Sequence, residues 1–297
     1  MINTSVYSDE ERRHFLRYTR TRQWPMLGRF PVADAAHTGL LAEMLACAPG
    51  VVDELISSLE DELRTVASQL LDDEAYRDAI RSLPWRPEER VVAVGDSITA
   101  DRLGWFELLA ATLTRGDRPT PTLVNLSVSG NTTADVIERF DLLEAAAPSR
   151  VLLMLGTNDA RAHGRAGGHR MATPGETGRN LLALRRLLGD DLGAEVTMIT
   201  PTAVDQGRVD EFFADAPVHW SASAVAEVAA VVRQADPDAI DLHDATRGAA
   251  TSNLEADGVH PTVAGQRFIL TRVLERLSVR PGAPRTGGGR QVPAPSS

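Results

Sequence analysis

The chain has 297 residues, of which 43% are hydrophobic and 24% are charged, and its formal net charge is −10. This length favours one large or two modest domains, and the composition is that of a globular protein with enough apolar residues for a buried core. The negative charge argues against a nucleic-acid partner, because binding to a phosphate backbone needs clustered positive charge. None of the 31 basic residues is a lysine, which excludes reactions that depend on a lysine amine, such as Schiff-base formation.

The cysteine content and the distribution of apolar residues also restrict the class of protein. A single cysteine, Cys47, excludes an internal disulfide and any metal site built from several cysteines. No stretch has the roughly 20 consecutive apolar residues that a membrane-spanning helix needs. Residues 1–22 are rich in Asp, Glu and Arg and lack the apolar core of a secretory signal. We therefore expect a cytoplasmic protein, and the use of arginine alone as the basic residue suggests a bacterial source with a GC-rich genome.

Residues 1–88 are predicted to form a helical region. Ser8 and Glu11 have the spacing of a capping box at the start of a helix. A stripe of apolar residues at helical spacing follows between about Gly50 and Asp72, made of Val52, Leu55, Ile56, Leu59, Leu63, Val66 and Leu70. We expect this stripe to pack on the rest of the chain, so that the helical region covers residues 89–279 or helps to form the rim of the substrate site. A homodimer through these helices, or a surface for a partner protein, remains an alternative.

Residues 89–279 alternate between short apolar strands and amphipathic helices. The predicted strands are 91–94, 122–125, 151–155, 196–200 and 239–242. The predicted helices are 105–114, 134–147, 176–188, 221–234 and 262–277. This alternation indicates a parallel sheet covered by helices on both faces, an α/β domain. Residues 280–297 are rich in Pro and Gly with almost no apolar side chains, and we expect them to be a disordered tail.

Polar residues follow the first three predicted strands and would meet at one edge of the sheet. The three blocks are Gly95-Asp96-Ser97, Asn125 to Thr132, and Gly156-Thr157-Asn158-Asp159. Ligands bind beyond the carboxyl ends of parallel strands. A serine hydroxyl, a glycine N–H and an asparagine amide at that edge are the groups that an acyl-transfer site needs. Taken singly, each block is equally typical of an ordinary turn or helix cap.

A fourth block, Asp257-Gly258-Val259-His260-Pro261, precedes the last predicted helix. Pro261 suits the first position of a helix. Asp257 lies three residues before His260, so one turn can bring its carboxylate to Nδ1 of the imidazole and leave Nε2 to accept a proton from a serine. An Asp-x-x-His pair alone also occurs in capping turns and metal sites.

With these four blocks in this order, the chain resembles the SGNH/GDSL hydrolases, in which serine, glycine, asparagine and histidine are supplied in the same sequence. The matching segments are 95–97, 129–133 after Asn125, 156–159 and 257–261. The resemblance covers about residues 89–279 and leaves the helical region and the tail unexplained. It implies a three-layer αβα, flavodoxin-like fold with a five-stranded parallel sheet, here with an N-terminal helical extension, and a serine hydrolase that uses no metal and no cofactor.

The resemblance also implies a role for each matching residue. Ser97 is expected to be the nucleophile, His260 the general base and later the general acid, and Asp257 the residue that orients His260. The N–H groups of Ser97 and Gly130 and the side-chain amide of Asn158 are expected to form the oxyanion hole.

Five further residues are candidates for the substrate rim. They are Asp96, Arg161, His163, Phe212 and Trp220. Asp96 is expected to brace the turn before Ser97. Arg161 would either bind an anionic group of the substrate or be exposed to solvent. His163 and His169 form a conceivable metal pair, but no carboxylate or cysteine cluster completes it, so we expect no metal. Phe212 and Trp220 would line a pocket or pack in the core.

The expected function is that of a serine esterase. Its substrate would be a small-molecule carboxylic ester with a small acyl group such as acetyl, carried by a sugar, a natural product or a lipid, and cleaved through an acyl-serine intermediate. An acyltransferase or thioesterase that uses the same acyl-Ser97 is an alternative. A binding protein that uses the N-terminal helices is a third.

Overall fold

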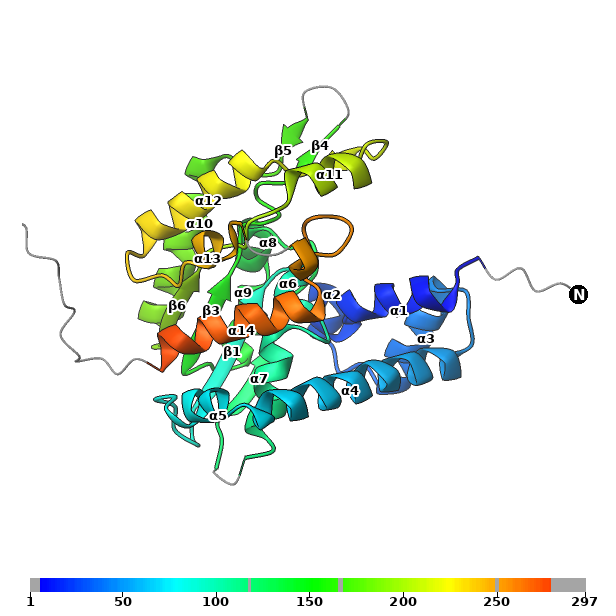
Figure 1. The fold of residues 1–297 in the computed structure, drawn as a ribbon, viewed down its shortest axis with the longest axis horizontal. Coiled ribbons are helices and arrows are strands. Elements are labelled where there is room, and N and C mark those ends of the chain that lie inside the picture. Colours follow the sequence, from blue (N-terminus) through cyan, green and yellow to red (C-terminus); the bar gives the residue numbers. More distant parts are fainter. Residues whose placement is uncertain (1–5, 117–118, 165–167, 249–250, 279–297) are drawn as a thin grey trace, which may run out of the picture.

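A computed structural model describes residues 6–116, 119–164, 168–248 and 251–278. Its centre is a parallel sheet with the strand order β2-β1-β3-β6. Figure 1 labels three of these strands, β1, β3 and β6. The strands are β1 (Arg90–Gly95), β2 (Thr122–Asn125), β3 (Arg150–Met154) and β6 (Glu195–Ile199). In this register Val91 of β1 lies opposite Leu123 of β2 and Arg150 of β3. The tail expected at 280–297 lies outside the described residues.

Helices connect and cover these strands. In the N-terminal region they are α1 (Asp9–Tyr18), η1 (Thr21–Gln23), α2 (Pro25–Gly28), α3 (Asp34–Met44), α4 (Pro49–Asp72) and α5 (Glu74–Arg81). Around the sheet they are α6 (Ser97–Ala100), α7 (Trp105–Leu113), α8 (Thr133–Glu138), α9 (Phe140–Ala145), α10 (Pro174–Arg186), η2 (Leu187–Asp191), α11 (Gln206–Phe212), α12 (Ala222–Ala235), α13 (Leu242–Thr246), η3 (Thr251–Asn253) and α14 (Val263–Leu277). Within the described ranges, no helix is both long enough and apolar enough to cross a membrane.

The two faces of the sheet pack against different sets of helices. Val91 and Ala93 belong to a cluster with apolar side chains of α7 and α14. Val92 and Val94, which point the other way because strand side chains alternate, belong to a cluster with α8, α9, α10 and α12. Helix, sheet and helix therefore form three layers (Figure 1), as the sequence predicts.

The N-terminal helices pack on this three-layer body. Ser8 caps α1 as the sequence predicts: its hydroxyl accepts the N–H of Glu11, and the Glu11 carboxylate accepts the N–H of Ser8. The apolar stripe of α4 packs against other helices of the same chain. Val52 and Leu59 pack with α1 and α3, and Val66 joins the core of the sheet's α7 side.

The fifth predicted strand, 239–242, is reduced to a single parallel bridge between Ile240 and Ile199. The N–H of Ile240 donates to Met198 at 2.9 Å, and the N–H of Thr200 donates to Ile240 at 3.0 Å. The next residue, Asp241, already caps α13 by accepting the N–H of Asp244. Because a helix begins directly after the bridge, the segment is too short to extend the sheet further.

The predicted helix 134–147 is interrupted at Arg139, which separates α8 from α9. Its backbone has φ −103° and ψ 28°, outside the helical range. The side chain is 1% exposed, and its Nε donates to Oδ1 of Asn131 at 2.9 Å. This inward-facing contact holds Arg139 where the helix breaks.

A second, small sheet lies beside the carboxyl ends of the main strands. It consists of β4 (Ala162–His163), β5 (His169–Arg170) and β7 (Val218–His219), all antiparallel. A hydrogen bond ties the segment after β5 to the loop after β3: the N–H of Ala172 donates to the carbonyl of Asp159 at 3.1 Å.

Candidate active site

Ser97 begins helix α6 directly after strand β1, at the carboxyl edge of the sheet. The preceding residue, Asp96, is the N-cap of this helix, and its carboxylate accepts the N–H of Ile98 at 3.0 Å. The first N–H groups of a helix have no partner within the helix. The hydroxyl and the N–H of Ser97 are thus presented together at the open end of the sheet.

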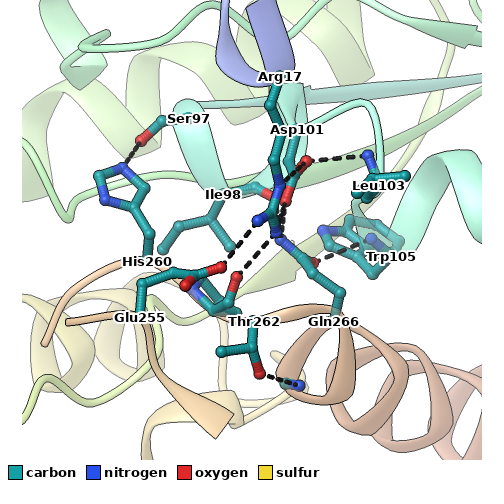
Figure 2. Close-up of polar contacts among 12 residues, drawn as sticks. Arg17, Ser97, Ile98, Asp101, Leu103, Trp105, Glu255, His260, Thr262 and Gln266 are labelled. Atoms are coloured by element: carbon teal, nitrogen blue, oxygen red, sulfur yellow. Dashed lines mark hydrogen bonds and ion pairs between the residues drawn. The ribbon is translucent and has the colours of Figure 1, made fainter. Parts of the chain in front are cut away.

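Ser97, His260 and Asp257 are joined by hydrogen bonds. Oγ of Ser97 lies 2.8 Å from Nε2 of His260, and Nδ1 of His260 lies 2.5 Å from Oδ2 of Asp257. The other carboxylate oxygen, Oδ1, accepts the N–H groups of Val259 and His260, each at 2.9 Å. Figure 2 shows the His260 ring turned toward Ser97 from the loop that precedes α14.

The Asp257 carboxylate is ionised in this arrangement. Burial on its own would raise the pKa of Asp257, but the hydrogen bond and the charge of His260, together with the two backbone N–H groups, outweigh burial and lower the pKa. A carboxylate of this kind fixes the proton of His260 on Nδ1, so that Nε2 faces the serine hydroxyl as an acceptor.

Gly130 and Asn158 lie in the same cleft as Ser97 and His260. Gly130 has φ +85°, a left-handed conformation that side-chain-bearing residues rarely adopt. Nδ2 of Asn158 donates to the carbonyl of Asn131 at 3.2 Å, which leaves its second N–H to point elsewhere. Asp159 braces both loops by accepting the N–H of Thr133 at 3.0 Å. The amide donors are therefore held by the loops after β2 and β3.

Asp96 is not at the substrate rim. It is 1% exposed and lies under the turn that carries Ser97, where it serves as a helix cap. Burial raises the pKa of Asp96 to about 6. The hydrogen bonds from Ile98 and Thr157 and the charge of His260 lower this pKa, but burial outweighs them. Its position fits the bracing role expected from the sequence.

The cleft that contains Ser97 has a volume of about 390 Å³. Two of the rim candidates, Arg161 and Trp220, line it. His163 and Phe212 are not among its lining residues: His163 is exposed on β4, and Phe212 is 57% exposed at the end of α11, where its ring contacts Phe213.

A larger cavity of about 580 Å³ lies at the opposite edge of the sheet. It is lined by residues that come before β1 and β2, among them Trp85, Leu113 and Pro121. None of the four sequence blocks contributes to it. The chemistry therefore points to the smaller cleft.

One wall of the smaller cleft comes from α1 and the residue after it, within the helical region that the sequence offers as a part of the substrate rim. It is formed by His14, Phe15, Tyr18 and Thr19. The ring of Tyr18 lies 4.9 Å from the ring of His260, centroid to centroid. Burial, and then the negative charge of Asp101, raise the pKa of Tyr18, so the phenol stays protonated. No motif marks these residues, because their contact with the cleft depends on how α1 packs.

Arg17, also on α1, links the loops that carry Ser97 and His260 (Figure 2). Its Nε and Nη2 donate to the two carboxylate oxygens of Asp101 at 2.8 and 2.7 Å. Its Nη1 donates to Glu255 at 2.7 Å, and Nη2 also donates to the carbonyl of Pro261 at 3.1 Å. Burial would lower the pKa of Arg17, but the hydrogen bond and charge of Asp101 raise it, so the guanidinium is charged.

Gln266 of α14 makes a second link to the same turn. Its Nε2 donates to the carbonyl of Ile98 at 3.0 Å and to Asp101 at 3.1 Å, and its Oε1 accepts the N–H of Trp105 at 2.9 Å. The side chain is fully buried. The helix that follows His260 is thereby fixed to the helix that begins with Ser97.

The sequence of the chain matches a known family model over most of the sheet domain. The model of the GDSL-like lipase/acylhydrolase family matches residues 93–268, more than half of the chain and a range that includes all four blocks. The chain belongs to this family. The resemblance seen in the sequence is thereby confirmed, and the protein is a carboxylic ester hydrolase of the GDSL type. A comparison with curated protein sequences finds no match.

Solved structures of similar fold agree with the α/β class. Acetylxylan esterase Axe2 from Geobacillus stearothermophilus is 20% identical, with a TM-score of 0.50 over 65% of this chain and 97% of its own. The acetyl xylan esterase AlAXEase is 22% identical, with a TM-score of 0.51 over 63% of this chain and 98% of its own. LAE5, an α/β hydrolase from the metagenome of Lake Arreo, Spain, is 22% identical, with a TM-score of 0.50 over 64% and 94%. At these identities the likeness establishes the fold.

Proposed function

We propose that this ester hydrolase works through an acyl-serine intermediate on Ser97. The observation that carries the proposal is the 2.8 Å contact between Oγ of Ser97 and Nε2 of His260. His260 takes the hydroxyl proton as Oγ attacks the ester carbonyl carbon, and then gives that proton to the departing alkoxide. Asp257, 2.5 Å from Nδ1, stabilises the imidazolium that forms between these steps. A water molecule activated by His260 then releases the acid.

The oxyanion of each tetrahedral intermediate would be held by three donors. These are the N–H groups of Ser97 and Gly130 and the side-chain amide of Asn158, all on the same cleft. Donors that are fixed before the reaction stabilise the developing charge without having to reorganise. The hydrogen bonds that hold Asn158 and its neighbour Asp159 support this role.

The substrate we propose is a small acyl ester, such as an acetyl ester, of a sugar or a similarly polar alcohol. The lining of the cleft has aromatic rings and polar groups, and it includes no aliphatic side chain among the described residues. A long fatty acyl chain needs an apolar groove, whereas aromatic faces and hydrogen-bonding groups suit a sugar ring. The solved structures of similar fold include two acetyl xylan esterases, AlAXEase and Axe2, whose names describe substrates of this kind.

Hydrolysis is favoured over transfer of the acyl group to another alcohol or thiol. The side chain of His260 is 20% exposed, so the imidazole ring of the proposed general base is open to water. An acyltransferase needs to exclude water from its acyl-enzyme.

The test is covalent labelling combined with ester turnover. A fluorophosphonate probe should label the wild-type chain and fail to label Ser97→Ala, which should also lose turnover of 4-nitrophenyl acetate. Ser58→Ala, at an exposed position on α4, is the matched control and should behave as wild type. Undiminished labelling of Ser97→Ala would refute the assignment. A series of 4-nitrophenyl esters from acetyl to palmitoyl should show its optimum at the short end.

A further inference from the structure

The residues that line the proposed active-site cleft differ in charge from the protein as a whole. The chain has a formal net charge of −10. None of the residues that line the cleft in the described part of the chain is an aspartate or a glutamate, and Arg161 is the one arginine among them. A cleft wall with low dielectric focuses the field of such a charge toward the ligand. The local charge therefore favours a negatively charged ligand group.

The guanidinium of Arg161 has no ionic partner within the described chain. Its Nε is buried and makes no hydrogen bond. Burial lowers the pKa of Arg161, and the charges of Asp135 and Asp96 act in the opposite direction only from a distance, without an ion pair. Arg170, nine residues further on, differs: its Nη1 lies 2.7 Å from the carboxylate of Glu227. A half-buried cation without a counter-ion costs free energy in the empty enzyme.

The position of Arg161 is nevertheless well defined. Its Cζ lies 5.9 Å from the centre of the Trp220 ring, a cation–π contact. Trp220 is 7% exposed, and its Nε1 donates to the carbonyl of Thr157 at 2.9 Å, so the ring is a fixed support. On the other side, Nη1 of Arg161 lies 4.0 Å from the point where a side chain on Gly130 would begin. The guanidinium is thus held beside one of the proposed oxyanion donors.

We propose that Arg161 is a specificity residue that binds a carboxylate carried by the substrate close to its ester bond. This inference rests on the proposed function and narrows it to esters with an anionic group, such as an acylated acidic sugar or a half-ester of a dicarboxylic acid. The planar guanidinium offers a carboxylate two parallel hydrogen bonds. Because Trp220 already fixes the group, little side-chain entropy is lost when it binds.

Two matched pairs of esters test whether a carboxylate is recognised and on which side of the ester bond it lies. Mono-4-nitrophenyl succinate and 4-nitrophenyl butyrate differ by a carboxylate on the acyl side. 3-Acetoxybenzoate and phenyl acetate differ by a carboxylate on the alcohol side. We expect the wild-type enzyme to show a higher kcat/KM for the charged member of one pair, and this preference should fall as ionic strength rises.

Arg161→Gln should remove this preference. Loss of a hydrogen-bonded charge pair of this kind should lower kcat/KM for the charged ester by about 10- to 100-fold. For the neutral ester, kcat/KM should change by less than about threefold. Arg161→Lys keeps the charge and should retain part of the preference. Arg186→Gln, at an exposed position on α10, removes the same net charge and should leave both values unchanged.

The outcomes separate the inference from the function on which it rests. Equal losses on charged and neutral esters in Arg161→Gln, or no preference for a charged ester in the wild type, would overturn the role of Arg161 while Ser97-dependent turnover still supported the esterase. Loss of all Ser97 dependence would instead overturn the proposed function. Labelling of Arg161→Gln by a neutral fluorophosphonate at the wild-type rate should show that the Ser97–His260 pair is intact. If that variant does not fold, the salt dependence of the wild-type preference decides.

Discussion

Arg17 and Asp101 form a buried, two-point ion pair between the N-terminal helices and the turn that carries Ser97. The Arg17 side chain is 9% exposed and that of Asp101 is fully buried. The third nitrogen of the same guanidinium binds Glu255, five residues before His260. One side chain from α1 therefore bridges the two loops whose separation sets the distance between Ser97 and His260 (Figure 2).

Arg17→Met should weaken both folding and turnover. It leaves the carboxylate of Asp101 buried without its counter-ion, which corresponds to a loss of about 3–5 kcal/mol in the free energy of unfolding. We expect kcat to fall on the order of 10- to 100-fold, because the His260 loop loses a positioning contact. The double variant Arg17→Met/Asp101→Asn should recover part of the stability. Denaturant titration and steady-state kinetics on 4-nitrophenyl acetate measure these effects.

Arg13→Met is the control on the same helix. Arg13 pairs with Glu62 on α4, and both side chains are about one third exposed, at 33% and 39%. Exposed pairs contribute about 0–1 kcal/mol, so stability and kcat should stay near the wild-type values. If the two variants behaved alike, the network around Arg17 would have no special role.

Asn158→Ala should lower kcat by about 10²–10³ with little change in KM, as expected for a donor that acts on the oxyanion. The Asn158 side chain is 3% exposed and also bonds Asn131, so thermal unfolding should be recorded alongside the kinetics. An effect on KM alone, with kcat preserved, would assign Asn158 to substrate binding.

Asp96→Asn should change how stability depends on pH. The pKa of Asp96 is raised from 3.8 to about 6 by burial in the folded chain. The neutral carboxyl therefore contributes fully to stability below the pKa of the unfolded chain, 3.8, and this contribution is lost as the pH rises through about 6. The loss amounts to about 3 kcal/mol in the free energy of unfolding. The free energy of unfolding of Asp96→Asn, measured relative to that of the wild type, should rise between pH 4 and pH 7. Above pH 7 this difference should stay constant. Unfolding titrations across this range provide the measurement.

Asp215→Asn provides the matched control for that experiment, because Asp215 is an exposed carboxylate. Its unfolding free energy should follow the wild-type curve at each pH. The other buried carboxylates titrate in both chains, so only the difference between variant and wild type is informative. A difference that stayed constant with pH would contradict the burial of an ionisable Asp96.

Removal of residues 1–85 should unfold the sheet domain. The deletion exposes the face of α7 that packs on α4, including the contacts of Val66 and Leu70. Each fully buried side chain of this size contributes about 1.5–3 kcal/mol, and a whole domain is stable by only about 5–15 kcal/mol. Circular dichroism and fluorophosphonate labelling of the truncated chain test this. A truncated chain that remained folded, with unchanged turnover, would show that the two regions are independent.

The sheet and the residues at its edge were accessible from sequence because they obey local rules. Val91 to Val94 form a strand that is apolar on both faces, and the polar residues that follow each strand must meet at one edge when strands are parallel. This is why Ser97 and Asn158 could be expected at a common cleft, whereas His260, which precedes a helix, was placed with them by the family resemblance. The break at Arg139 and the single bridge at Ile240 were not foreseen, because each depends on one side-chain contact: Arg139 turns inward to Asn131, and Asp241 caps the helix that follows the bridge.

The individual residues by which the helical region forms a wall of the cleft could not be inferred in this way. Arg17 and Glu255 are 238 positions apart, and neither the ion pair nor the contact between Tyr18 and His260 leaves a periodic pattern in the chain. Such contacts follow from how a helix docks, which is decided by the packing of Leu16 against Leu59 and their neighbours.

The single stretch of residues 14–19 supplies most of one wall of the cleft and also the side chain that anchors this wall. The other residues around the reacting bond are set into loops that the sheet holds in place. A new alcohol or acyl preference could therefore arise from exchanging three or four side chains within this one stretch, with the nucleophile and its base untouched. A combinatorial library confined to His14, Phe15 and Thr19 would sample that space while Arg17 kept the helix docked.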